Sequence, residues 1–196
     1  QRVLALTASD EPFAVAHLPK LLPKGDYHRC PDSSATLHAD HLLLGWGLGA
    51  YRFERYLAGT ESPRLHSEGH GEPALAMLDA SLRVRDWINL PTEDMGPEQL
   101  QSAVFDAALA FNAKAEAIIG DDLLQQNFPT IHAVGRASHR APRLLRLDWG
   151  DAAHPHVVLC GKGVCFDTGG LDIKTADGMR NMKKDMGGAA HALALA

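Results

Sequence analysis

The last third of the chain places an apolar run directly before a glycine-rich, charged segment, and this order constrains the fold strongly. Residues 156–160 read His-Val-Val-Leu-Cys, and Gly161-Lys162-Gly163 follows them. A nearly continuous apolar run is expected of a strand that is covered on both faces, as in parallel sheets flanked by helices. Open α/β sheets bind ligands at the carboxyl ends of their strands. We therefore predict a buried strand at 156–160 and a ligand site directly after it.

Lysines and aspartates recur among the glycines beyond this run, at Lys162, Asp167, Lys174 and Asp185. Glycine lets the backbone approach a ligand closely, and carboxylates are natural oxygen ligands for divalent cations. A lysine in such a place either neutralises charge or acts as a perturbed amine. Taken alone, Lys162 would be a solvated turn lysine, and a P-loop does not fit because neither Ser nor Thr follows it. The residue types suggest a metal site without fixing its reaction.

Together these segments resemble the signature of the M17 leucyl aminopeptidase family. Residues 161–174 read GKGVCFDTGGLDIK, which is similar to the family pattern GKG-x-x-FD-[ST]-GG-x-x-x-K, and residues 185–190 read DMGGAA, like the turn that follows it. Three further stretches are similar to family motifs, at 49–56, 85–98 and 131–143. The resemblance covers most of the chain beyond Leu42 and implies a metal-dependent exopeptidase.

The resemblance also implies a role for each of the four charged residues. Asp167 matches a carboxylate that bridges two divalent cations, Mn²⁺ or Zn²⁺, and Lys162 and Asp185 match ligands of the more loosely held cation. An amine ligates only when unprotonated, so Lys162 would need a strongly lowered pKa, which two nearby dications supply. Lys174 matches a lysine that stays charged and acts on the scissile carbonyl and its developing oxyanion. We expect the side chains of Asp167 and Asp185 to converge on one pocket.

The implied reaction is the removal of amino-terminal residues, Leu-like ones preferred, from peptides by a water that two cations activate. The resemblance further implies a cytoplasmic homo-oligomer, typically a hexamer. The family draws its remaining metal carboxylates and its catalytic arginine from an N-T-D-A-E-G-R segment, which the 196 residues lack. We therefore expect this chain to be a truncated fragment with little or no activity of its own. The alternative is an inactive fragment or non-catalytic binding module of the same family.

Composition narrows the other classes of function. The formal net charge of −5 argues against a nucleic-acid partner held by bulk electrostatics. No apolar run is long enough to span a bilayer, so we expect no membrane partner. Cys30, Cys160 and Cys165 form no CxxC pair, which indicates reduced thiols in a cytoplasmic protein. The apolar surroundings of Cys165 predict an inert, buried thiol.

The pattern along the chain predicts an α/β fold in two domains. The loop expected at 61–71 separates a partial amino-terminal α/β domain, 1–71, from residues 72–196. The second part should hold a linker helix at about 73–90 and the truncated first part of the catalytic α/β domain, with a mixed sheet flanked by helices. Besides 156–160, strands are expected at 3–6 and 143–148, and further helices from Ser33 or Ser34 through residue 57, at 121–126 and at 191–196. By propensity alone, the helix that begins at Pro97 could continue to Ile119, but the family resemblance implies that it ends at about 111 and that a strand follows at 114–119.

Several other polar residues are expected to stand outside the chemistry. Thr168 should be a hydrogen-bonding turn residue, because no base is suitably placed to make it a nucleophile. Asp172 and Asp177 should be surface carboxylates, and His191 a packing or surface residue. The loop histidines His66 and His70 should be solvated.

Overall fold

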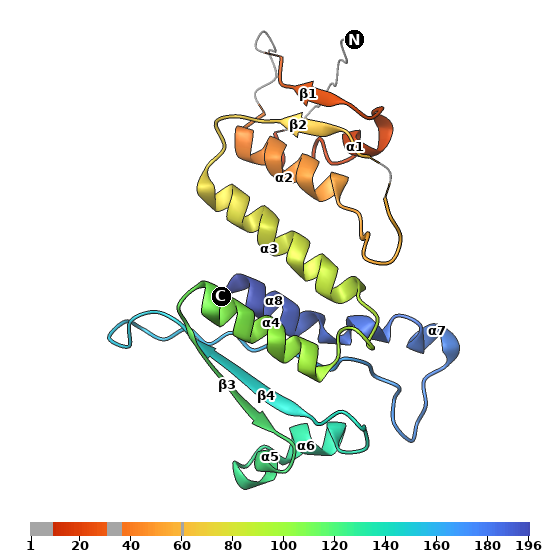
Figure 1. Ribbon diagram of the computed structural model, residues 1–196, viewed down its shortest axis with the longest axis vertical. Coiled ribbons are helices and arrows are strands. Elements are labelled where there is room, and N and C mark those ends of the chain that lie inside the picture. The colour runs from red at the N-terminus through yellow and green to blue at the C-terminus, as the bar shows by residue number, and fades with distance from the viewer. Residues whose placement is uncertain (1–9, 31–36, 60) are drawn as a thin grey trace. The chain divides into compact units, whose positions relative to one another are not determined.

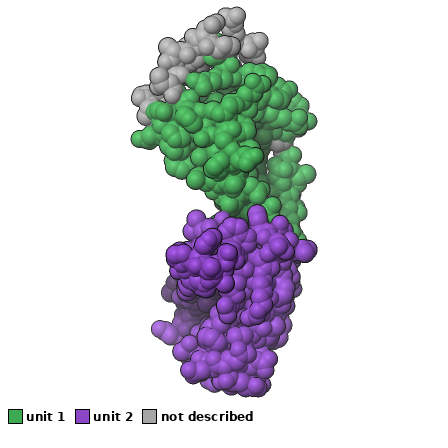
Figure 2. All heavy atoms as spheres, turned by 90° about the vertical axis from the view of Figure 1, so that its left-hand side faces the viewer, with its two compact units in different colours: residues 1–85 green, residues 86–196 purple. Residues whose placement is uncertain are grey.

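The computed structural model describes residues 10–30, 37–59 and 61–196, so the strand expected at 3–6 and the capping serines Ser33 and Ser34 lie outside the described residues. The chain divides into two compact units, 1–85 and 86–196 (Figures 1 and 2). In chain order the elements are α1 Leu18–Leu21, β1 Asp26–His28, α2 Ala39–Ala50, β2 Arg64–His66, α3 Glu72–Asn89, α4 Pro97–Ala110, β3 Lys114–Ile119, α5 Asp122–Gln125, α6 Pro129–Gly135, β4 Arg143–Asp148, α7 Ala176–Met179, the 3₁₀ helix η1 Met182–Met186 and α8 Gly187–Leu195.

The first unit is built on a two-stranded parallel ladder and the helices beside it. Tyr27 pairs with Leu65 at the centre of the β1–β2 ladder, and these two side chains are less exposed than their neighbours along each strand. Leu65 also packs against a buried cluster formed by Val15, Leu37 and Leu42. The ladder therefore has one face toward the core and one toward solvent, as the two-residue period of a strand requires.

Helix α2 begins and ends differently from the prediction. The side chain of His38, which precedes the first helical residue, accepts a hydrogen bond from the backbone N–H of Asp40 at 3.3 Å. The helix ends at Ala50 rather than at residue 57. Glycines at 47 and 49 weaken helix propensity near this end. In addition, Arg85 Nη1 donates to the carbonyl of Leu48 at 2.6 Å, which satisfies one of the last-turn carbonyl groups.

The loop predicted at 61–71 contains strand β2, which is a correction to the sequence-based prediction. The strand is only three residues long, Arg64–His66, and it exists through parallel pairing with β1 far earlier in the chain. A local pattern of Gly, Ser, Pro and His cannot reveal such a non-local partner. His66 is consequently a strand residue whose Nε2 lies 2.8 Å from Asp26 Oδ1, rather than a free loop histidine.

The two long helices follow the sequence closely. Helix α3, Glu72–Asn89, ends two residues before Pro91, as expected from the restriction that proline places on its predecessor. Helix α4 starts with Pro97 in its first turn. The backbone N–H of Gly96 donates to the side chain of Gln99 at 3.2 Å, which caps this start.

The second unit centres on the antiparallel pair of β3 and β4, whose six-residue register runs from Lys114 opposite Asp148 to Ile119 opposite Arg143. Helix α4 packs on both strands, and its buried side chains Leu100, Val104 and Ala108 recur every four residues on one face. Helices α5 and α6 lie at the end of the hairpin where β3 finishes (Figure 1). The predicted bounds of β3 and β4 are confirmed, and the short helix predicted at 121–126 is present as α5, Asp122–Gln125.

The predicted buried strand at 156–160 is wrong. These residues form no strand, and the side chains of Val157 and Val158 are 84% and 79% exposed. A strand exists only where its backbone groups bond to a neighbour, and within the described part of the chain β3 and β4 pair solely with each other. An apolar composition favours burial, but it does not supply the neighbouring strand with which these residues would have to pair.

The α/β fold class is confirmed, with small sheets of which one is parallel and the other antiparallel. Over the described residues, we find no helix with both the length and the apolar character needed to cross a bilayer.

Candidate metal centre

The four charged residues singled out in the sequence lie on two segments of the second unit. Lys162, Asp167 and Lys174 belong to the irregular segment before α7, and Asp185 lies in η1 immediately before α8. The segments meet where the backbone N–H of Ala189 donates to the carbonyl of Lys162 at 2.9 Å. This contact brings the start of α8 against the backbone that carries Lys162.

A glycine permits this close approach. A Cβ atom on Gly188 would lie 2.8 Å from the backbone nitrogen of Lys162, closer than carbon and nitrogen normally approach. Gly188 thus allows close packing of α8 on the segment that carries Lys162, which is not a strand.

Each aspartate is paired with one lysine. Lys162 Nζ lies 2.9 Å from Asp185 Oδ2, and Lys174 Nζ lies 3.4 Å from Asp167 Oδ2. The Lys162 ammonium also acts electrostatically on Asp167, whose pKa it helps to lower. Asp185 is the most buried of the four, with 17% of its side chain exposed, whereas Asp167 and Lys174 are about one-third exposed. The electrostatic effect of Lys162 on Asp167 is the link between the two pairs.

The turn that carries Asp167 is held by its own backbone. The N–H of Gly169 donates to Asp167 Oδ1 at 2.8 Å, and this hydrogen bond, followed by that from Lys174, holds the pKa of the carboxyl below its usual range. Gly169 and Gly170 have φ values of 91° and 71°, a left-handed conformation that glycine adopts readily. The carbonyl of Thr168 accepts from the N–H of Lys174 at 2.9 Å, so Thr168 is a turn residue as expected. The turn presents an ionised carboxylate in a fixed place.

The carboxylate of Asp185 raises the pKa of Lys162 above its ordinary value, mainly through their direct contact. An amine coordinates a cation only after losing its proton. Ligation by Lys162 would therefore require strong positive charge nearby to reverse this direction. A bound dication beside Asp185 would supply that charge and would compete with the ammonium for the same carboxylate.

The carboxylate and amine donors of this site are of the kinds that bind divalent cations, but they would fill only part of a coordination shell. Asp185 Oδ2 is buried, and no donor is aligned on it as a hydrogen bond, although Lys162 Nζ is close enough for an ion pair. A buried carboxylate oxygen without a directed partner is suited to a cation. No group of three His, Cys, Asp or Glu side chains able to hold a metal occurs in the described residues. The site therefore offers two carboxylates and an amine, fewer donors than two complete shells need.

The exposure of Asp172 and Asp177 and the local hydrogen bond of His191 agree with the surface and packing roles expected of them. Asp172 and Asp177 are exposed, and His191 Nδ1 lies 2.7 Å from the carbonyl of Gly187 in its own helix. Cys165 is buried, and burial raises the pKa of its thiol to about 11.

Two hydrogen bonds next to the site were not anticipated from the sequence. Thr92 Oγ1 donates to the carbonyl of Cys165 at 2.9 Å, and Lys183 Nζ donates to the carbonyl of Asn89 at 2.6 Å. The available signal was the stretch 85–98, which resembles a family motif but carries no group for the reaction itself.

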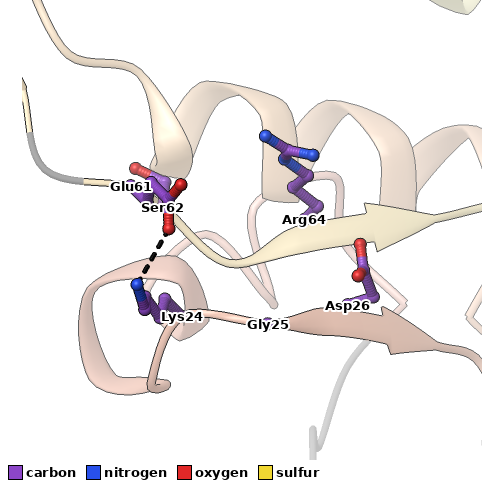
Figure 3. Close-up of a pocket in the computed structure, with 6 residues that line it drawn as sticks. All are labelled: Lys24, Gly25, Asp26, Glu61, Ser62 and Arg64. Carbon is purple, nitrogen blue, oxygen red and sulfur yellow. Dashed lines mark hydrogen bonds and ion pairs between the residues drawn. The ribbon is translucent and has the colours of Figure 1, made fainter.

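A surface hollow in the first unit differs in its chemistry from the candidate metal centre. Lys24, Gly25, Asp26, Glu61, Ser62 and Arg64 line it (Figure 3). Its cations and anions balance, and Lys24 Nζ is already paired with Glu61 Oε2 at 3.0 Å. Nothing in this lining singles out a ligand.

Comparison with known protein families places the site in a defined domain. The sequence model described as "Cytosol aminopeptidase family, catalytic domain" matches residues 83–196, which include all four charged residues. A second model, "M17 aminopeptidase, N-terminal domain", matches residues 1–65. These two matches place the chain in the class of the peptidases. The chain belongs to the M17 cytosol aminopeptidase family.

Individual relatives agree with this placement. The chain is 47% identical over 171 residues to Peptidase B of Yersinia pestis (strain Pestoides F), a match that covers 78% of this chain and 39% of that protein. Peptidase B of Pectobacterium carotovorum is 49% identical over 125 residues, which covers 58% of this chain and 28% of that protein. The chain thus spans well under half the length of these curated relatives.

Solved structures show the same fold. Cytosol aminopeptidase from Coxiella burnetii superposes with a TM-score of 0.88 at 44% identity, over 96% of this chain and 42% of that one. The bottromycin maturation enzyme BotP in complex with Mn superposes with a TM-score of 0.74 at 25% identity, over 93% of this chain and 42% of that one. Leucyl aminopeptidase from Trypanosoma brucei in complex with bestatin gives 0.68 at 26% identity, over 80% and 32%.

Proposed function

We propose that the protein that carries this chain is a metal-dependent aminopeptidase that removes amino-terminal residues, Leu-like ones preferred, from peptides. One observation carries the proposal: two lysine–aspartate pairs, Lys162–Asp185 and Lys174–Asp167, lie within the part of the chain that matches the catalytic domain of an aminopeptidase family. The names of the relatives, Peptidase B and cytosol or leucyl aminopeptidase, support a peptide substrate.

We propose that Asp167 bridges two cations, that Asp185 and Lys162 ligate one of them, and that the ions are Mn²⁺ or Zn²⁺. The BotP structure in complex with Mn supports a divalent ion in a relative of this fold. When bound, such a pair lowers the pKa of a shared water and polarises the scissile carbonyl. Remaining ligands would have to come from outside the described residues, because the site supplies only three donors of this kind.

The chain's own residues would prepare the reaction in distinct ways. Asp167 stays ionised at neutral pH, because its hydrogen bond from Gly169 and its contact with Lys174 lower its pKa. The Lys174 Nζ atom lies 3.4 Å from Oδ2 of that carboxylate. We propose that the Lys174 ammonium stabilises the negative charge that develops on the carbonyl oxygen of the peptide. Fixing this charge before the reaction avoids reorganisation during it.

We propose for the whole protein the organisation that the sequence suggested. Residues 1–71 would form a partial amino-terminal domain, and residues 72–196 the linker helix and the first part of the catalytic domain. The family assignment supports a cytoplasmic location and a homo-oligomer, which we propose to be a hexamer. Light scattering on the protein expressed with the coding sequence that adjoins this chain in its gene tests the oligomeric state. The same coding sequence reveals whether an N-T-D-A-E-G-R segment follows.

Replacing Asp167 by Asn tests the function directly. The amide is a weak neutral ligand, so we expect hydrolysis of Leu-p-nitroanilide with saturating Mn²⁺ to fall by at least about 100-fold, since several kcal/mol of charge stabilisation would be lost. Exposed Asp172→Asn serves as the matched control and should retain wild-type turnover. Circular dichroism should show that both variants fold. Unchanged turnover in Asp167→Asn would contradict the assignment.

A further inference from the structure

Residues 89–93, the last residue of α3 and the first part of the loop before α4, are here called the connector, and the connector is bonded to the segment that carries Asp167. The Thr92 hydroxyl donates to the carbonyl of Cys165 at 2.9 Å, in a partly buried place. Cys165 lies two residues before Asp167 and is itself only 8% exposed. The hydrogen bond therefore fixes the backbone on which the Asp167 turn begins.

The same connector is bonded to the segment that carries Asp185. Lys183 Nζ donates to the carbonyl of Asn89 at 2.6 Å, again partly buried. Lys183 lies two residues before Asp185, and Met186, directly after it, is fully buried. The neighbouring Lys184 is exposed. Of the two adjacent lysines, Lys183 therefore contacts the connector and Lys184 faces solvent.

The connector is a firm support for both bonds. Pro91 fixes one backbone dihedral, and Leu90 is 7% exposed. Arg140 Nη1 donates to the carbonyl of Thr92 at 2.9 Å, while Arg140 Nε donates to Glu98 Oε2 at 2.8 Å. The Arg140 side chain is 17% exposed. Charge-assisted hydrogen bonds of this kind are strong and directional, so Thr92 is itself held in place.

We propose that Thr92 and Lys183 are positioning residues that set the separation of the Asp167 and Asp185 carboxylates for a pair of divalent cations. Both aspartates lie in segments without strand pairing, so no ladder of backbone hydrogen bonds fixes their distance. Two side-chain bonds to one connector perform that task. The inference rests on the proposed metal-dependent function and adds residues that touch neither substrate nor metal.

Direct Mn²⁺ binding tests the proposal on the protein expressed with its adjoining coding sequence. Thr92→Val removes the hydroxyl at nearly constant volume, and Lys183→Met removes the ammonium but keeps an unbranched apolar side chain that is one atom shorter. Changes in groups that orient metal ligands typically cost 10- to 100-fold in metal affinity. We therefore expect each variant to bind Mn²⁺ about tenfold more weakly by isothermal titration calorimetry. Thr92→Ser, which keeps a hydroxyl, and Lys184→Met, the adjacent exposed lysine, should bind like wild type.

The thermal midpoint without metal, measured in parallel, separates positioning from simple support of the fold. A lower midpoint with unchanged Mn²⁺ affinity in both Thr92→Val and Lys183→Met would overturn the proposal, as would unchanged values of both quantities. Because the two bonds are separate, loss of folding in one variant leaves the other as the test. A wild-type protein that neither binds Mn²⁺ nor hydrolyses Leu-p-nitroanilide would refute the proposed function itself. Variants that bind Mn²⁺ as tightly as an active wild-type enzyme would instead refute only the positioning role of Thr92 and Lys183.

Discussion

At the scale of single residues, two lysines on one segment have different neighbours. Lys162 contacts Asp185, the more buried aspartate, at 2.9 Å, whereas Lys174 contacts Asp167 at 3.4 Å within a turn. The pKa of Lys162 is raised by its partner, so its contribution to folding is present below the ordinary lysine pKa and is lost as pH rises through the raised one. A cation bound at Asp185 would compete with the Lys162 ammonium for that carboxylate, whereas Lys174 contacts Asp167 instead. The roles proposed for the two lysines therefore differ.

Substitution of the two lysines should separate these roles. In the Lys162→Arg protein we expect lower metal content, because a guanidinium does not deprotonate and cannot ligate. In the Lys174→Ala protein we expect unchanged metal content with turnover reduced by about 100-fold, since the loss falls on the transition state. Inductively coupled plasma analysis of purified proteins gives the metal content. Equal content in Lys162→Arg and wild type would refute the ligand role.

At the scale of elements, the junction between α8 and the Lys162 segment should tolerate added volume at one glycine but not at the next. In Gly188→Ala the new Cβ meets backbone, which cannot move aside, so we expect a loss of about 1–3 kcal/mol in the free energy of unfolding. In Gly187→Ala the new Cβ meets only the end of the Ile88 side chain at 3.3 Å, so the change should be within about 1 kcal/mol and can be stabilising. Urea denaturation of both variants gives the comparison. Equal losses would show that the junction is not tightly packed.

Elements defined by local patterns were predictable, and those defined by distant partners were not. Helix α3 lies within one residue of its predicted range, because apolar periodicity and Pro91 define it locally. Strand β3 also has its predicted bounds, but the prediction came from the family resemblance, since propensity alone favoured a helix that continues to Ile119. Strand β2 was missed and 156–160 was wrongly assigned, because strand formation depends on a neighbour elsewhere in the chain. The ligand candidates followed from a motif, whereas the bonds from Thr92 and Lys183 required coordinates.

At the scale of the whole molecule, the three cysteines report on both units. Cys30 is exposed in the first unit, and the second unit holds exposed Cys160 and buried Cys165. Because burial raises the Cys165 pKa to about 11, its reactive thiolate is scarce at pH 8. We expect iodoacetamide to label Cys30 and Cys160 quickly and Cys165 only after unfolding. Peptide mass spectrometry identifies the labelled sites, and fast labelling of Cys165 in native protein would contradict the described packing.

The exposed apolar segment at 157–159 has a consequence for how this chain behaves in concentrated solution. Its backbone has no strand partner among the described residues, and Val157, Val158 and Leu159 strongly favour extended structure. Such a segment is a template onto which an identical segment of another molecule can add, the first step toward cross-β stacking. Pro155, which lacks a backbone N–H, limits that growth at one end only. An apolar stretch whose composition suits burial is therefore also an aggregation hazard wherever it stays uncovered.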